Sequence, residues 1–451
     1  MSPIEGLLIF LSILCIYFLL VILLHKKGIL EKYNISLYGP ALLLRTKKVR
    51  NFLKKLASKK RFWKAFGSFS IVFCFIMMVI LVIAFIFNTW AVLGFTPEEV
   101  EKLPGIEYAL VLPGINPILP LEYIGYIILA LIVAIIVHEF SHGILTFASN
   151  LKVKSLGILY LIVPLGAFCE PDEKEIKKTK TKNRMRIYAA GPMANFVVVF
   201  ISILLFSFVF MSAVQPAADG LEVFYVAEDT PAENIGLSPG TIITDINGTR
   251  ITNYDEFFYA LENTSAGQTV SISFVKKETT YNKNVTLADK SNYTKNQSHL
   301  GNGYLGMAPN PFIDFLPILK NPFNNFPSNF LLFYIVPLLG LDGYNPIFSP
   351  FTDAYVITGP LGTIPDNIFW AIVNSLYWIF WLNLAVALFN VLPIVPLDGG
   401  FMFNDAIRSF IKRVKNDLSD EKREKIVKNT SMVVSITVLL LVIFPFLIKY
   451  F

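Results

Sequence analysis

The chain has 451 residues, 54% of them hydrophobic and 40 of them phenylalanine. This apolar content is too high for a soluble enzyme of this length, so the composition indicates an integral membrane protein. The formal net charge of +6 comes from basic blocks between apolar runs. The positive-inside rule explains such blocks, so no nucleic-acid partner is expected. Cys15, Cys74 and Cys169 show no pairing pattern, and a disulfide framework is not expected.

Several apolar runs are long enough to cross a bilayer, which takes about 20 residues of helix. They are Ile4 to Leu24, Phe66 to Ala91, Leu121 to Phe147, Ile187 to Ala213, Trp370 to Pro393 and Ser431 to Ile448. A cleaved signal peptide is the alternative for the first run, but its basic cluster follows the run instead of preceding it. We therefore predict a polytopic α-helical membrane protein with about six transmembrane helices.

Charge is distributed unevenly among the loops that join these runs. Loops 25–64, 150–186 and 408–428 are basic, whereas 92–120 and 214–367 contain more acidic than basic residues. Basic loops stay on the cytoplasmic side of a membrane. We therefore predict that the three basic loops are cytoplasmic and that both termini and the 214–367 region are extracytoplasmic.

The third run contains the motif His138-Glu139-x-x-His142. Residues four apart lie on one face of a helix, so both imidazoles can bind the same metal ion. Zinc is the expected ion, and it lowers the pKa of a bound water towards about 7. Glu139 then serves as the general base. Two ordinary core histidines are the alternative, but unpaired ionisable groups inside a membrane span cost a few kcal/mol each.

Asp398 is the best candidate for a third metal ligand. It lies in FNVLPIVPLDGG, residues 389–400, at the cytoplasmic end of the fifth run, which is the depth zone of His138. Pro393 and Pro396 end the helix and leave backbone groups free to line a cavity. An ordinary helix-capping aspartate is the alternative while the LDGG segment is considered alone.

The region between the fourth and fifth runs is predicted to be rich in β-structure. Residues 223–308 alternate short β-branched runs with Gly, Asn and Pro. The stretch 230–275 resembles a PDZ domain of the protease-associated kind. That resemblance implies a domain that binds an extended peptide by strand addition. A spacer or steric gate that binds no peptide is the alternative, and the residues favour neither.

HEFSH, AAGPMANF (Ala189 to Phe196) and NVLPIVPLDGG occur in this order, with the PDZ-like insert between the second and the third. Together they resemble the site-2 protease family of intramembrane zinc metalloproteases, over roughly residues 121–410. The resemblance implies one zinc ion per chain, a general base and substrate-positioning groups. The implied zinc ligands are His138, His142 and Asp398, the base is Glu139, and the substrate-binding residues are Asn195, Asn390, Pro393 and Pro396. One role that the resemblance implies for Asn195 is to polarise the carbonyl of the scissile peptide bond.

These observations predict a zinc endopeptidase that cleaves transmembrane segments of membrane-anchored proteins, as in regulated intramembrane proteolysis. The substrate helix must unfold locally, and the hairpin predicted at 156–169 offers a strand edge for pairing. A catalytically silent metal-binding scaffold or sensor is one alternative, against which the intact Glu139 argues. A metal transporter is the other, but such a protein is expected to show repeated halves, and the sequence shows no internal repeat.

The predicted segments follow from the order of these features. They are 1–120, two transmembrane helices with a basic loop; 121–213, the first part of the catalytic membrane core; 214–310, the PDZ-like domain; 311–368, a Pro-rich amphipathic segment; and 369–451, the second part of the core with the last transmembrane helix.

Overall fold

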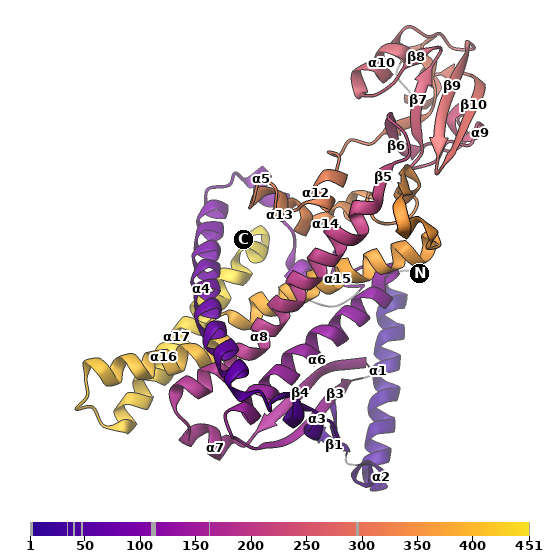
Figure 1. The fold of residues 1–451 in the computed structure, drawn as a ribbon. Coiled ribbons are helices and arrows are strands. Elements are labelled where there is room, and N and C mark those ends of the chain that lie inside the picture. The colour runs from indigo at the N-terminus through magenta and orange to yellow at the C-terminus, as the bar shows by residue number, and fades with distance from the viewer. Residues whose placement is uncertain are drawn as a thin grey trace. The chain divides into compact units, whose positions relative to one another are not determined.

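The structure is a computed structural model that describes residues 3–33, 35–38, 41–46, 48–109, 114–161, 163–294 and 297–450. The chain forms two compact units, which are described separately (Figure 1). The membrane unit comprises residues 1–116, 121–200 and 379–451, and the second unit comprises residues 117–120 and 201–378.

Among the described residues, five helices are long and apolar enough to cross a membrane. They are Lys60–Leu93 (α4), Leu121–Ala148 (η2 and α6), Thr181–Ala213 (α8 to η4), Asp366–Val391 (α15) and Asp420–Tyr450 (α17 and η9). Each coincides with one of the predicted runs after the first. The first run forms α1 (Pro3–Lys26), of which Cys15–Lys26 qualifies as a shorter apolar helix, so the sixth span stays a prediction.

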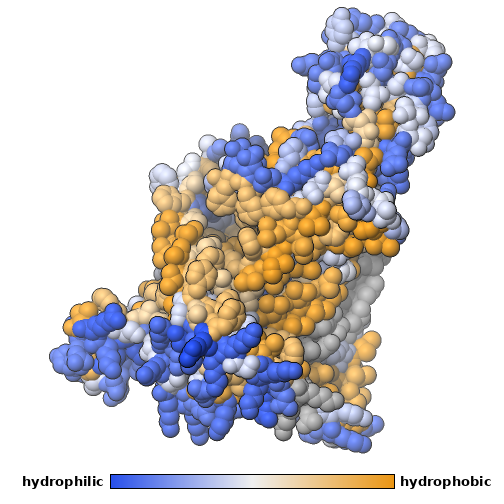
Figure 2. All heavy atoms as spheres, in the orientation of Figure 1, coloured by the Kyte–Doolittle hydropathy of each residue, from blue (hydrophilic) through white to orange (hydrophobic). Residues whose placement is uncertain are grey.

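Large apolar side chains cover the outer faces of these helices. On α4, Trp90 is 72% exposed and Val79 is 56% exposed, as expected for residues that contact lipid. Figure 2 shows the apolar surface bordered by hydrophilic residues on the side of α3 and α7. The remaining elements of the membrane unit are short, apart from α16: α2 (Ile29–Lys32), α3 (Lys48–Leu56), α5 (Pro97–Glu101), η1 (Ile106–Ala109), α7 (Glu173–Lys178) and α16 (Asp398–Val414).

An antiparallel four-stranded sheet in the order β1-β2-β3-β4 lies in the membrane unit. The predicted hairpin is formed by β3 (Val153–Leu161) and β4 (Val163–Pro171). Two further strands, β1 (Ile35–Tyr38) and β2 (Ala41–Thr46), come from the basic loop 25–64, where sequence analysis predicted no strand. Because β2 pairs with β3, β4 keeps a free edge within the described sheet.

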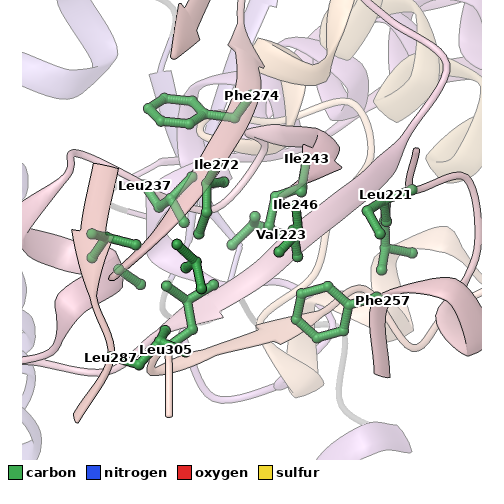
Figure 3. Close-up of a cluster of buried hydrophobic side chains, with 14 residues drawn as sticks. Leu221, Val223, Leu237, Ile243, Ile246, Phe257, Ile272, Phe274, Leu287 and Leu305 are labelled. Atoms are coloured by element: carbon green, nitrogen blue, oxygen red, sulfur yellow. The ribbon is translucent and has the colours of Figure 1, made fainter. Parts of the chain in front are cut away.

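The second unit contains the predicted β-rich region. Its main sheet has the order β10-β9-β7-β6-β13, with β8 paired to β7. Asn247 and Gly248 both have positive φ angles, which suits the tight turn that joins β7 to β8. A compact apolar core lies between this sheet and α10, and Figure 3 shows Val223, Ile243 and Phe257 within it.

The elements of the second unit are mostly short. The strands are β5 (Val214–Pro216), β6 (Leu221–Val226), β7 (Ile242–Ile246), β8 (Thr249–Arg250), β9 (Thr269–Lys276), β10 (Thr279–Thr286), β11 (Ala288–Asp289), β12 (Gly303–Tyr304), β13 (Met307–Pro309) and β14 (Tyr355–Ile357). The helices are α9 (Pro231–Asn234), α10 (Tyr254–Glu262), α11 (Ser291–Thr294), α12 (Leu316–Lys320), α13 (Ser328–Tyr334) and α14 (Val336–Leu339).

Candidate metal centre

Helix α6 presents His138 and His142 on one face, as the spacing predicts. Their ring centroids are 4.8 Å apart, and both residues are buried, at 8% and 9% exposure. A buried imidazole needs partners for its ring nitrogens. Both rings therefore belong to a polar cluster inside an otherwise apolar helix.

Asp398 at the first turn of α16 completes this cluster. Its Oδ2 lies 3.1 Å from His138 Nε2 and 3.2 Å from His142 Nε2. The glycines that follow it explain the LDGG sequence: a Cβ on Gly399 would collide with the carbonyl oxygens of Val391 and Leu392. Only glycine lets the start of α16 pack this closely against the end of α15.

The three side chains fit a zinc ion. A tetrahedral ion with bonds of about 2.0–2.1 Å keeps its ligand atoms about 3.3 Å apart, close to the separations of Asp398 Oδ2 from the two Nε2 atoms. Asp398 Oδ2 is buried and has no hydrogen-bond partner among the described residues. A Cβ on Gly191 would lie 2.6 Å from His138 Nε2 and closer still to His142 Nε2. The glycine of the GPMAN segment thus keeps open the space beside the ligand atoms.

The other nitrogen of each imidazole is also bonded. His142 Nδ1 lies 2.7 Å from the carbonyl oxygen of Ile187, and His138 Nδ1 lies 2.8 Å from Asn195 Oδ1. A carbonyl only accepts, so His142 Nδ1 carries the proton and its Nε2 is free to bind a metal ion. Asn195 is fully buried, and its amide also donates to Ala134 O and to Asn383 Oδ1.

Glu139 lies on the side of α6 that faces the sheet. Its Oε2 accepts a 2.6 Å hydrogen bond from the backbone N–H of Cys169 in β4. This bond orients the carboxylate and shows that β4 directs a backbone donor away from β3 at this residue. The general-base candidate and the free edge of β4 are therefore adjacent.

Asn390 lies in the last turn of α15, and Pro393 and Pro396 lie on the segment that leads from α15 to Asp398. The side chain of Asn390 donates to Val386 O one turn earlier, at 3.0 Å. Ser435 on α17 holds the proline segment, because its Oγ donates to Pro393 O and accepts from Val395 N. Within the described residues, no hydrogen bond joins Asn390 to the three candidate ligands.

Sequence reasoning missed several residues of this centre. Asn383 on α15 bonds to Asn195, and Gly191 provides space, yet neither was singled out. An asparagine inside a membrane span is a signal in itself, because a polar side chain there needs a partner. For Gly191 the signal was its place in the GPMAN segment.

Residues 126–439 match the model of peptidase family M50. The chain belongs to peptidase family M50. Among its relatives, an uncharacterized protein of Methanocaldococcus jannaschii is 29% identical over 392 residues, which covers 86% of this chain and 84% of that protein. Zinc metalloprotease RasP of Shouchella clausii is 27% identical over 237 residues, covering 51% and 52%. The membrane-bound transcription factor site-2 protease homolog of Arabidopsis thaliana is 24% identical over 173 residues, covering 38% and 30%.

Part of the M50 chain is also similar to two solved structures. The PDZ domain of the SdrC-like protein of Listeria innocua is 25% identical and covers 21% of this chain and 98% of its own, with a TM-score of 0.18. The second domain of the listeria protein Lin2157 is 26% identical and covers 22% and 88%, also with a TM-score of 0.18. The predicted family and the predicted enzyme class, a zinc metalloprotease, are confirmed by the family match and the named relatives.

Proposed function

We propose that this M50 peptidase is an intramembrane endopeptidase that hydrolyses a peptide bond within the transmembrane segment of a membrane-anchored protein. One zinc ion per chain is held by His138, His142 and Asp398. The observation that carries the proposal is the convergence of two imidazole nitrogens with one carboxylate oxygen, all within 4.8 Å of one another. The nitrogens come from a helix long and apolar enough to span a membrane, and the carboxylate comes from the first turn of α16. Ligands of this kind are a usual catalytic zinc set.

The residues around the ligands perform the proton transfers. Zinc, when bound, supplies Lewis acidity that lowers the pKa of a coordinated water and polarises a carbonyl. Glu139 accepts the proton of the attacking water and returns it to the leaving nitrogen. The N–H of Cys169 keeps the Glu139 carboxylate oriented for this task. Asn390 and the Pro393–Pro396 segment contact the substrate where the chain passes from α15 to the metal ligand.

The free edge of β4 is the substrate-binding surface in this proposal. A helical substrate hides its carbonyls in its own hydrogen bonds, so the segment to be cut must become extended. An extended segment that adds to β4 gains backbone hydrogen bonds in return. Because Cys169 of β4 bonds to Glu139, a strand on this edge passes next to the general base. The scissile bond is expected beside Cys169.

The proposed topology follows the charges of the loops. The loops 25–64, 150–186 and 408–428 are cytoplasmic, the active site lies nearer the cytoplasmic face, and the β-rich region and both termini are extracytoplasmic. The functional segments are 1–120, 121–213, 214–310, 311–368 and 369–451. The PDZ-like domain binds peptide or excludes substrates with large ectodomains, and in the latter case another protease first shortens the substrate, as in regulated intramembrane proteolysis.

Glu139→Gln tests the mechanism, because it removes the base and retains the ligands. Cleavage of a membrane-embedded reporter by the purified full chain should fall about 10²–10⁴-fold, while one zinc stays bound. Glu122→Gln makes the same change at the far end of the helical segment that carries His138, and should cleave normally. If Glu139→Gln cleaves at the normal rate, the mechanism is wrong. Zinc binding by a wild type that cuts no reporter would instead favour the silent scaffold, and zinc flux into liposomes the transporter.

A further inference from the structure

We propose that Asn195 and Asn383 form an amide relay that fixes the tautomer of His138, which makes both of them positioning residues for the metal ligand. The inference rests on the proposed function in that it concerns the same zinc site. The relay runs from α15 through α8 to α6: Asn383 accepts from Asn195 at 2.9 Å, and Asn195 bonds to His138 Nδ1 at 2.8 Å.

The two histidines differ in how their tautomer is fixed. His142 Nδ1 faces the carbonyl oxygen of Ile187, which can only accept a hydrogen bond. This single contact therefore fixes the tautomer of His142. His138 Nδ1 faces a side-chain amide, which can accept through its oxygen or donate through its nitrogen. The tautomer of His138 therefore depends on which end of the Asn195 amide points towards it.

Fixed acceptors on two helices decide the orientation of Asn195. The side chain of Asn383 donates to the carbonyl oxygen of Ile379 at 2.8 Å, so its Oδ1 is the end that faces Asn195. Asn195 Nδ2 then donates to Asn383 Oδ1 and, at 3.0 Å, to Ala134 O. Both hydrogens of this amide are used, so Oδ1 faces His138 and must receive the Nδ1 proton.

The alternative orientation is costly and blocks the metal site. Asn195 and Asn383 are both fully buried. A flip of either amide would turn two donors or two acceptors towards each other, and no water is there to replace the lost hydrogen bonds. A flipped Asn195 would also force the proton of His138 onto Nε2. That proton would point at Asp398 Oδ2, 3.1 Å away, and occupy the lone pair that binds zinc.

Zinc affinity of the folded full chain, measured by competition with a chelator, tests the relay. Asn195→Leu should weaken zinc binding about 10–100-fold. Asn383→Leu should weaken it on the order of 5–10-fold, because Ala134 O still holds one hydrogen of the Asn195 amide. The control is Asn374→Leu, which removes another buried amide of α15 whose bonds go to the carbonyls of Ile347 and Trp370. This control should bind zinc as the wild type does.

A purely structural role makes a different pattern. In that case all three leucine variants would lose thermal stability, and none of those that fold would lose zinc affinity. The relay is therefore overturned if folded Asn195→Leu and Asn383→Leu bind zinc as tightly as the wild type or the Asn374→Leu control.

A second measurement needs no variant that has to fold. ¹⁵N NMR of histidine-labelled, zinc-loaded wild type should show His138 protonated on Nδ1 and bound through Nε2; the chain has only four histidines to assign. Binding through Nδ1 would also overturn the relay. Neither readout involves cleavage, so a wild type that cuts no reporter would refute the proposed function and leave the relay standing.

Discussion

Gly191→Ala changes one hydrogen to a methyl group and is expected to abolish zinc binding. Gly191 lies on α8 beside the ligand nitrogens, and an added Cβ would be 2.6 Å from His138 Nε2 and closer to His142 Nε2. Ordinary van der Waals contact begins near 3.4 Å. The neighbouring atoms must therefore separate by about 0.8 Å or more.

The size of this displacement decides the outcome. A zinc site tolerates deviations of about 0.2 Å in its bond lengths, so the required movement is about four times too large. The methyl group also fills space that the ion and its water need. Zinc content should fall from about one ion per chain to less than about 0.1, and reporter cleavage should fall at least about 10³-fold. The helix itself should survive, because alanine is favoured over glycine in a helix by up to about 1 kcal/mol.

The assay is zinc content by elemental analysis of the purified full chain, together with cleavage of a membrane-embedded reporter. Gly125→Ala is the matched control: it makes the same change on α6, where the added Cβ has no neighbour within 4 Å among the described residues. The control should retain one zinc and normal cleavage. If the Gly191→Ala variant folds and binds zinc with wild-type affinity, the ion does not occupy the space beside Gly191, and the reasoning is refuted.

Two further predictions concern groups away from the ligands. Arg184 makes two 2.8 Å hydrogen bonds to Asp405, which is 3% exposed and also pairs with Arg408. Because Arg408 remains as a partner of the carboxylate, Arg184→Gln should cost about 2 kcal/mol. Thermal unfolding should show that the double variant with Asp405→Asn is less destabilised than the sum of the two single effects, and additive effects would exclude coupling. Burial raises the pKa of Glu222 on β6 to about 7, despite a hydrogen bond from Asn310. Because its ordinary pKa is 4.5, the neutral carboxyl stabilises the fold fully below about pH 4.5, and this contribution is lost as the pH rises to about 7. Glu222→Gln should therefore raise the unfolding temperature of the full chain at pH 8 but not at pH 4, and parallel pH profiles for the two proteins would contradict it.

The membrane-spanning helices and the three converging side chains were accessible from sequence for a physical reason. Long apolar runs have few alternatives to a transmembrane helix, and ionisable residues within them must be paired. Helical spacing was enough to predict that His138 and His142 share a site. The prediction of Asp398 also required its expected depth in the membrane and the resemblance of its motif to a known family. The structure brings these three together.

The strands β1 and β2 were not predicted, because their formation depends on a distant partner. Ala41–Thr46 is a short, Leu-rich stretch in a basic loop, and it becomes a strand by pairing with β3, more than a hundred residues later. Strand formation reflects such neighbours more than local preference. Asn195 illustrates the same limit: its sequence context predicted a role at the site, but its partners on two other helices could not be read from its own segment.

The four-residue spacing of the two histidines in HEFSH is matched by a four-residue spacing on α8. This match explains why the two helices form the metal site together. Ile187, Gly191 and Asn195 are spaced by four residues and share one helical face. Ile187 bonds to His142 and Asn195 bonds to His138, so the two helices run antiparallel in register, with Gly191 lying where the ion is expected. Fixing one imidazole with a backbone carbonyl requires no particular side chain at that position, whereas the other ring and the open space require an amide and a glycine. The identities of Gly191 and Asn195 are therefore set by the metal site, and the identity of Ile187 is set by packing alone.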